Sequence, residues 1–318
     1  MPEPHDGPKP VTLLGRTLAL HGNRDDPYFR NAEAILAVQA PLQAWAQANL
    51  PRDAVVIDAG GNIGLTALIL SALVPDGHVH VFEALPANAE YLRANIAANG
   101  IRNCTVNAVA LGNRPGSVPM KASSPGSHVM PGAGAGADGA TMVPMATLDS
   151  YVEAAGLTRV DFIKMDVEGF EPAVLEGASA TVERFRPPVL MEFNTWCLSY
   201  VQNFSARDFA LLLWDAFEVR SIDAAGGESP AGGGDVHSFF HHNVVLHGTV
   251  EDVLLRLRPG ARVPGTGGLE FRSASALERM ETRRHQAEAQ ALRLQLEAMR
   301  RSTSWRVTAP LRALRRLV

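Results

Sequence analysis

The sequence predicts an α/β protein built on a mostly parallel sheet of seven strands with helices on both faces. From about residue 50 to residue 258, short apolar runs of strand length alternate with segments of helix length. The first run ends in an acid and a glycine turn, Asp58 to Gly64, which opens the next helix. Because parallel strands need a crossover connection, this alternation indicates a sheet covered on both faces.

The expected elements follow in chain order. Residues 11–20 are expected to form a short strand or hairpin, and residues 31–49 a helix that stops at Pro51. The expected strands are 55–57, 78–82, 105–108, 161–165, 189–193, 217–222 and 239–246. The expected helices are 63–73, 86–99, 148–155, 171–177 and 206–216. Residues 112–140, rich in Gly, Pro and Ser, are expected to be a mobile surface loop with a small hairpin at 117–121, and residues 224–234 a second flexible loop.

Changes in composition divide the chain into three parts. Residues 1–50 are expected to pack on the core, 51–258 to form the α/β domain, and 259–318 to form a Gly/Pro linker, a coiled-coil-like helix and a basic amphipathic tail. After Glu278 the chain carries ten Arg and three Glu. Residues 275–318 therefore suit contact with an anionic membrane surface, with another protein or with a second copy of the chain, while a solvated, frayed end is the simpler alternative.

The overall composition is that of a soluble globular protein. The chain is 46% apolar and 19% charged, and its net charge of -4 does not indicate a nucleic-acid partner. Cys104 and Cys197 lack neighbours at metal-ligand spacing, which predicts free thiols, no structural metal site and a reducing compartment. Neither a signal peptide nor a spanning helix is expected, so the prediction is a cytoplasmic protein, with the tail allowing a peripheral position at the inner face of the cell membrane.

The glycine turn carries the first functional prediction. Gly60 and Gly61 let the backbone turn sharply and let a ligand approach closely, and Gly64 allows the helix to pack close to the ligand or sheet. Glu83 ends the second strand, 25 residues after Asp58, where a carboxylate can accept hydrogen bonds from two ribose hydroxyls. This order predicts a nucleoside lying across the carboxyl ends of the strands, where an open parallel sheet binds ligands.

Two alternatives compete with this interpretation. A structural glycine turn without a ligand is one. A dinucleotide such as NAD is the other, but its GxGxxG pattern fails because the glycines fall at 60, 61 and 64. Asp58 would also repel a pyrophosphate, whereas it suits the ammonium and sulfonium of S-adenosylmethionine (SAM). The charge pattern therefore favours SAM.

Acidic residues after later strands are the candidates for chemistry. Asp166, Glu168 and Glu171 follow the fourth strand and Glu192 ends the fifth. Transfer of a methyl group from a sulfonium to an alcohol requires removal of the hydroxyl proton, for which Asp166 and Glu168 are the first candidates and Glu192 the next. Helix capping and pairing with Lys164 are the structural alternative for these acids. Three histidines are further candidate bases: His237, His241 and His242. Mg²⁺ held by Asp166, Glu168 and Glu192 is a less favoured way to acidify the hydroxyl.

Three motifs occur in chain order: VVIDAGGNIGLTAL, VHVFEALPANAEYLRANIAANG and VDFIKMDVEGFEPAVLEGA. In these motifs, and over roughly residues 50–250, the chain resembles the FkbM family of SAM-dependent methyltransferases, which are mostly O-methyltransferases. The resemblance implies a Rossmann-like class I methyltransferase fold whose last strand is antiparallel. It implies SAM contacts at Asp58, Gly60, Asn62, Gly64 and Glu83, and near Asn107, Ala108 and Val109. Gly61 stands where Ala is common.

The expected reaction is O-methylation of a hydroxyl on a sugar or surface-polysaccharide intermediate. The basic tail supports this expectation because it is similar to the endings of bacterial glycosyltransferases and methyltransferases from surface-polysaccharide clusters. Methylation of a small natural product such as a polyketide is one alternative. A non-catalytic scaffold that kept the SAM fold and works through its tail is the other.

Overall fold

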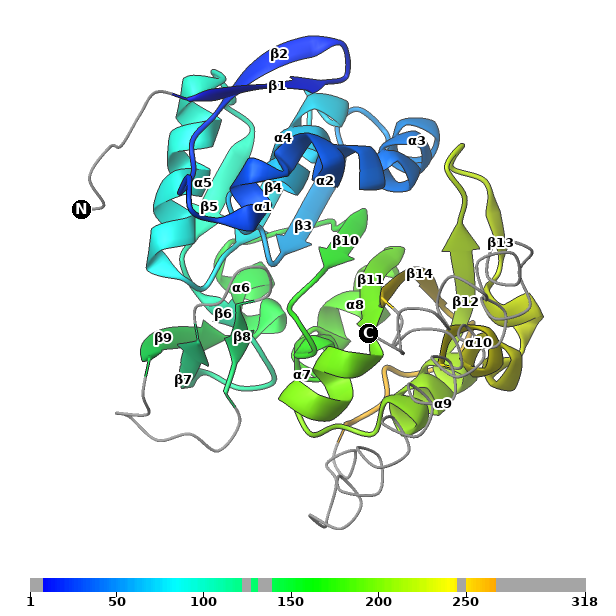
Figure 1. Ribbon diagram of the computed structural model, residues 1–318. Coiled ribbons are helices and arrows are strands. Elements are labelled where there is room, and N and C mark those ends of the chain that lie inside the picture. Colours follow the sequence, from blue (N-terminus) through cyan, green and yellow to red (C-terminus); the bar gives the residue numbers. More distant parts are fainter. Residues whose placement is uncertain (1–7, 122–126, 131–138, 245–249, 267–318) are drawn as a thin grey trace, which may run out of the picture. The chain divides into compact units, whose positions relative to one another are not determined.

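The computed structural model describes residues 8–121, 127–130, 139–244 and 250–266 (Figure 1). The expected coiled-coil-like helix and basic tail lie outside these residues. No helix in the described part of the chain is long and apolar enough to cross a membrane.

The main sheet confirms the predicted α/β, Rossmann-like architecture. Its strand order is β13-β12-β14-β11-β10-β3-β4-β5. Neighbours from β11 to β5 pair in parallel, and β14 runs antiparallel between β11 and β12. The strands are β3 (Val55–Ala59), β4 (His78–Phe82), β5 (Cys104–Asn107), β10 (Phe162–Met165), β11 (Val189–Asn194), β12 (Phe217–Ile222), β13 (Glu228–Pro230) and β14 (Val250–Leu257). In the described part of the chain this sheet has the expected seven strands and, at its edge, β13 as a short eighth. Figure 1 shows β13 beside β12.

The prediction of a strand at residues 239–246 is wrong. Residues 236–244 form helix α10 (Val236–Val244), and the last strand, β14, begins at Val250. Asp235 caps this helix by accepting hydrogen bonds from the backbone N–H and the hydroxyl of Ser238, both at 2.9 Å. Val236 and Phe239 are buried at helical spacing. A short apolar run does not distinguish helix from strand, and here the Asp235 cap decides in favour of the helix.

The loop expected at residues 224–234 is also partly ordered into β13 and a short 3-10 turn, Ala231–Gly234. Glu228 explains why this segment returns to the sheet. Its carboxylate lies 2.9 Å from Arg220 Nε and 2.6 Å from Arg256 Nη1, and it accepts a hydrogen bond from the indole N–H of Trp45. The arginines come from β12 and β14, so ion pairs hold β13 against the edge of the sheet.

Helices cover both faces of the main sheet. On one face, α4 (Leu65–Leu73) and α5 (Pro86–Ala98) pack with the N-terminal segment against Val56, Val79 and Val81. On the other face, α6 (Leu148–Ala154), α7 (Glu171–Glu176), α8 (Ser179–Phe185) and α9 (Ala206–Ala216) pack against Ile57, Ile163 and other strand residues. The alternation of strand side chains between the two faces therefore builds two apolar cores.

The N-terminal segment begins with the expected hairpin, β1 (Lys9–Leu13) and β2 (Arg16–Leu20). Side chains of α5 hold it, because the Oδ1 atoms of Asn95 and Asn99 accept hydrogen bonds from the backbone N–H groups of His21 and Ala19. After α1 (Pro27–Arg30), the helix expected at 31–49 is broken into α2 (Ala32–Val38) and α3 (Ala40–Asn49). Pro41 explains the break, since proline cannot donate the i→i−4 bond that would continue α2.

The prediction of a loop at residues 112–140 is wrong in part. Within it lie β7 (Gly116–Lys121) and β8 (His128–Val129), two strands of a second sheet of order β6-β9-β7-β8. The flanking strands β6 (Ala110–Leu111) and β9 (Ala140–Ala146) complete this sheet. Alternate residues Met120, Val143 and Met145 bury one face of it against Leu85. Residues 122–126 and 131–138 lie outside the described part. This sheet stands beside the carboxyl ends of the main strands and forms a wall of the pocket described next.

Candidate functional site

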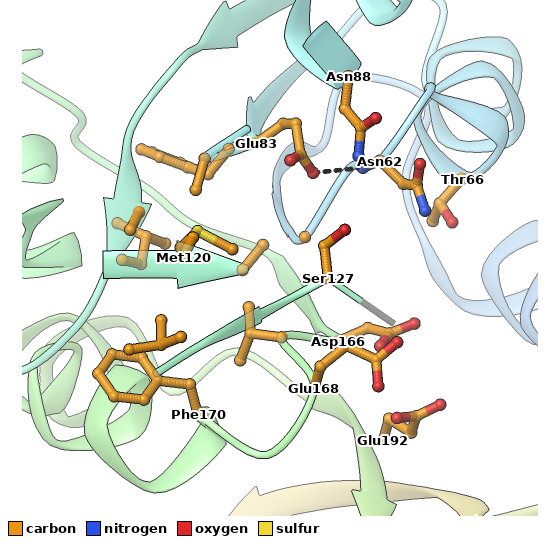
Figure 2. Close-up of a pocket in the computed structure, with 18 of the residues that line it drawn as sticks. Asn62, Thr66, Glu83, Asn88, Met120, Ser127, Asp166, Glu168, Phe170 and Glu192 are labelled. Carbon is orange, nitrogen blue, oxygen red and sulfur yellow. Dashed lines mark hydrogen bonds between the residues drawn. The ribbon is translucent and has the colours of Figure 1, made fainter. Parts of the chain in front are cut away.

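A pocket of about 290 Å³ lies at the carboxyl ends of β3, β4 and β10, where the strand order reverses. This volume is close to the lower end of the range for small-molecule sites, about 300–1,000 Å³. One part of its wall is apolar and includes Ala84, Val109, Leu111, Met120, Val129 and Phe170. The other part is polar and includes Tyr28, Gln39, Asn62, Glu83, Asp166, Glu168 and Glu192. Figure 2 shows Glu83 and Asn62 on one side, and Asp166, Glu168 and Glu192 on another.

The backbone amides of the glycine turn are already bonded within the protein. Gly60 N and Gly61 N both donate to Phe82 O at 2.9 Å, and Gly64 N donates to Gly61 O at 2.8 Å. Asn62 N donates to Glu83 Oε2 at 2.8 Å. A phosphate site needs such amides to be free and pointed at the ligand. The turn therefore does not offer the anion cradle of a dinucleotide site, in agreement with the charge argument made from Asp58.

Gly60 is the glycine that the pocket requires. Its φ is +93°, in the left-handed region, and a Cβ there would lie 1.7 Å from the carbonyl oxygen of Asp166. Gly60 therefore lets β3 and β10 approach closely where both strands end. Gly61 and Gly64 face away from the pocket, since Cβ atoms there would meet side-chain carbons of Val81 at 2.2 Å and Leu92 at 2.4 Å.

Glu83 lies in the pocket wall with a fixed orientation. One carboxylate oxygen accepts from Asn62 N and the other from Leu85 N, both at 2.8 Å, and the Asn88 side chain adds a third hydrogen bond. Burial raises the pKa of Glu83, while these hydrogen bonds oppose the shift. The backbone of Ala84 is a fourth donor. Since a carboxylate has about four lone-pair sites, a ligand hydroxyl at Glu83 would have to share or replace one of these donors.

Asp58 lies behind the pocket wall. It is buried, its Oδ2 has no hydrogen-bond partner, and the pocket is lined at this strand by Ala59 instead. Burial raises its pKa to about 7, and the positive charge of Lys164 opposes that shift. The structure thus does not place Asp58 in direct contact with the pocket, and its influence on a ligand acts through its charge.

Asn107 and Ala108, two residues expected to contact SAM, do not line the pocket. Asn107 Nδ2 donates to Val81 O at 3.1 Å, which ties β5 to β4, and neither residue belongs to the pocket wall. Val109, the third residue that the resemblance implies here, does line the pocket, together with Ala110 and Leu111. Because β6 starts at Ala110, the chain turns toward the second sheet at this point and presents the later residues to the cavity.

The acids after β10 and on β11 converge. Asp166, Glu168 and Glu192 all line the pocket, as Figure 2 shows. Glu168 has a φ of +56°, a left-handed conformation that is uncommon outside glycine and costs on the order of 1–3 kcal/mol. Its Oε2 accepts a hydrogen bond from the Cys197 thiol at 3.2 Å. Burial, and then the negative charge of Asp166, raise the pKa of Glu168, and burial raises that of Glu192 in the same way.

Lys164 is a cation buried among these acids. Its Nζ lies 3.5 Å from Asp166 Oδ2 and 3.6 Å from Asp252 Oδ1 on β14. Burial alone would lower the pKa of Lys164, but the charges of Asp252 and Asp166 outweigh burial and raise it. Lys164 is therefore positively charged and partly balances the acids, in a pocket where carboxylates outnumber it.

Glu171 and His237 do not belong to the group in the pocket. Glu171 is fully buried, accepts a hydrogen bond from Val167 N at 2.9 Å and has its pKa raised to about 8 by burial, so it supports the 166–169 turn. His237 was expected near the site, but it lies exposed on α10, because this segment is a helix and not a strand. The side chains of His241 and His242 are outside the described residues. Among the described residues, no three His, Cys, Asp or Glu side chains are arranged to hold one metal ion.

Several pocket residues were not expected from the sequence, among them Tyr28, Ile35, Gln39, Met120 and Ser127. They come from the N-terminal segment and the second sheet. No motif marks these residues, and the sequence predicts only a surface loop with a small hairpin at 112–140.

The chain is similar in sequence to one known family of proteins. The family model described as "Methyltransferase FkbM domain" matches residues 58–219, just over half of the chain. Among curated proteins, no relative matches.

Similar solved structures include three methyltransferases. The O-methyltransferase from Bacillus cereus in complex with SAH is 16% identical, over 72% of this chain and 87% of that one, with a TM-score of 0.40. The O-methyltransferase TomG from Streptomyces achromogenes, in complex with SAM, is 13% identical, over 69% and 79%, with a TM-score of 0.38. The precorrin-6y C5,15-methyltransferase from Geobacter metallireducens is 11% identical, over 75% and 94%, with a TM-score of 0.41. Similarity this low carries no information about the substrate of this chain.

Proposed function

The chain belongs to the FkbM family of SAM-dependent methyltransferases, and from this premise we propose that it methylates a hydroxyl group of a sugar or surface-polysaccharide intermediate. The observation that carries the proposal is the group of three carboxylates, Asp166, Glu168 and Glu192, in one wall of the pocket. Burial raises the pKa of Glu192 to about 10, so this acid is protonated at neutral pH and can both donate and accept. The carboxyl oxygens of the group offer several acceptors to a polyhydroxylated acceptor, which presents several O–H donors at once.

The residues present fit SAM. The backbone amides of Gly60, Gly61, Asn62 and Gly64 are bonded within the protein and do not face a phosphate, and Asn62 Oδ1 and Gln39 Oε1 are buried acceptors without a partner. Among the described residues, the acids of the polar wall outnumber the adjacent cation Lys164, which favours a cationic ligand. Glu83 faces the cavity where it can accept from ribose hydroxyls, and Gly60 and Asn62 would lie beside the nucleoside.

Bound SAM would supply an activated methyl group on a sulfonium. The chain must then bind the acceptor, exclude water and take up the hydroxyl proton. We assign proton uptake to the Glu168 carboxylate, because its raised pKa makes it a stronger base than an ordinary glutamate and because the Cys197 thiol donates a hydrogen bond that orients it. Asp166, adjacent to the Lys164 cation, would orient the acceptor by accepting a hydrogen bond from one of its hydroxyls.

The test is methyl transfer from isotope-labelled SAM to a panel of acceptors: nucleotide sugars, oligosaccharides and polyketide-like alcohols and phenols. We expect label in a sugar, in a form that resists mild alkali, since a methyl ether is stable there and a methyl ester on a carboxylate is not. Transfer to the polyketide-like compounds alone would contradict the sugar proposal, and alkali-labile label would contradict transfer to a hydroxyl.

Replacement of Glu83 tests the cofactor end of the pocket. Glu83→Ala is expected to weaken SAM binding by about 1.5–3 kcal/mol, the range for a hydrogen bond to a charged group, which is roughly a ten- to hundredfold increase in Kd. Isothermal titration calorimetry measures the change. Glu90→Ala, an exposed acid on α5, is the matched control and should leave Kd unchanged. Wild-type affinity in Glu83→Ala would remove Glu83 from the binding site.

A further inference from the structure

Residues outside the family-matched region also line the pocket. Tyr28, Ile35 and Gln39 line it, and all three precede residue 58, where the family match begins. They come from α1, from α2 and from the junction between α2 and α3. The N-terminal segment therefore contributes a wall of the pocket as well as packing on the core.

The positions of these residues are fixed by local structure. Pro27 starts α1, and the Asp26 carboxylate caps it by accepting a hydrogen bond from Tyr28 N at 2.8 Å. Gln39 lies where Pro41 stops α2 from continuing. Phe29, Ala32 and Leu36 on the same helices are buried in the core. The pocket-lining side chains are thus presented by anchored helices.

Gln39 presents a buried acceptor that nothing in the described structure satisfies. Its Oε1 is buried and has no hydrogen-bond partner, and the residue lines the pocket. Leaving a buried carbonyl unpaired is unfavourable, so such a group in a binding site indicates a ligand that donates a hydrogen bond there. Asn62 Oδ1, also in the pocket wall, is a second unpaired acceptor.

Tyr28 adds an aromatic ring and a hydroxyl to the acidic part of the pocket. Burial, and then the negative charges of Asp166 and Asp58, raise the pKa of Tyr28, so its hydroxyl stays protonated. Tyr28 lines the same pocket as Asp166 and Glu83. A ring face in such surroundings attracts a ligand cation, and the phenol oxygen can accept a hydrogen bond from it.

We propose that the N-terminal helices recognise the amino-acid end of SAM, with Gln39 Oε1 and the Tyr28 side chain binding its ammonium group. An ammonium carries three N–H donors, no acceptor and a positive charge. It therefore matches an unpaired amide oxygen, an aromatic face and an excess of carboxylates together, whereas the adenosine end matches the apolar wall and Glu83. This inference rests on the proposed use of SAM and extends it to residues outside the family-matched region.

The experiment compares two ligands in the full chain by isothermal titration calorimetry. S-adenosylhomocysteine keeps the ammonium, and 5′-methylthioadenosine lacks the whole amino-acid end. Gln39→Leu and Tyr28→Leu are each expected to weaken binding of S-adenosylhomocysteine by about ten- to hundredfold, as for a lost interaction with a charged group. Neither should change the affinity for 5′-methylthioadenosine. The matched controls, Gln47→Leu on the exposed face of α3 and Tyr91→Leu on α5, lie outside the pocket.

A second readout separates recognition from a structural role. Because Gln39 Oε1 is unpaired without a ligand, Gln39→Leu should leave the melting temperature of the ligand-free chain unchanged or raise it. An equal loss of affinity for both ligands, or an unchanged affinity for S-adenosylhomocysteine, would overturn the inference. Failure of the unaltered chain to bind either ligand would overturn the use of SAM itself.

Discussion

Glu168→Gln is expected to lower kcat by about 10²–10⁴-fold while SAM affinity stays nearly constant. Loss of a general base typically has this effect, and the amide keeps the size of the side chain in the same left-handed backbone position. The pH profile is a second readout. Because a protonated acid cannot accept a proton, wild-type activity should fall as pH decreases through the raised pKa of Glu168, and the variant should lack that limb. Rates are measured with the acceptor identified by the labelling assay.

Glu153→Gln, an exposed acid on α6, is the matched control and should keep full activity. An unchanged kcat in Glu168→Gln would contradict the assignment of proton uptake to this residue. A chelator tests the remaining alternative. If it abolishes activity and added Mg²⁺ restores it, the carboxylates hold a metal that acidifies the hydroxyl, and Glu168 acts as a ligand rather than as a base.

The regular part of the fold was predictable because its signals are local. Strands at 55–59, 78–82 and 189–194 are short apolar runs that end in an acid or a turn, and their positions agree with the sequence to within two residues. The wrong prediction of a strand at residues 239–246 also comes from relying on a local signal. Two adjacent phenylalanines fit a strand or a helix equally well, and the deciding contact is a cap at Asp235 that the apolar pattern does not show.

Four acids at the ends of the strands were predicted to lie in the pocket, and they do. For residues within the strands, the sequence did not tell which side chains face the pocket. Glu83, Asp166, Glu168 and Glu192 lie in the pocket wall, because carboxyl ends of parallel strands meet at one edge. Asp58 lies behind the wall although it belongs to the same motif, since neighbouring strand residues point to opposite sides and Ala59 takes the position on the cavity.

The residues from the N-terminal segment and the second sheet could not be predicted, for a different physical reason. Tyr28 and Gln39 reach the pocket only through packing of α1 and α2 on a core assembled from distant strands. Met120 depends on a sheet whose strands are separated by residues without any strand pattern. Contacts of this kind depend on tertiary structure, so a local sequence motif does not predict them.

Lys164→Met is expected to destabilise the fold by about 1–3 kcal/mol, because the charges of Asp166 and Asp252 lose their buried cation. The effect is smaller than for a fully buried ion pair, since the two acid side chains are 35% and 41% exposed. Lys164 is 1% exposed, and its Nζ lies within 3.6 Å of the Asp252 carboxylate and closer still to that of Asp166. Methionine has a similar volume, so the effect reports charge rather than a cavity. Urea unfolding at pH 8 measures it. Lys121→Met, at an exposed position on β7, is the matched control and should change stability by less than about 0.5 kcal/mol.

The pH dependence of Lys164→Met distinguishes charge from packing. Without the cation, the clustered carboxylates repel one another, which raises their pKa values in the folded state above those in the unfolded state. A group with a raised folded pKa favours folding at low pH and loses that contribution as pH rises. The stability difference between Lys164→Met and the wild type should therefore narrow as pH falls from about 8 to about 5. A difference that stays constant over this range would show that the buried lysine contributes through packing, and that the acids around it do not depend on its charge.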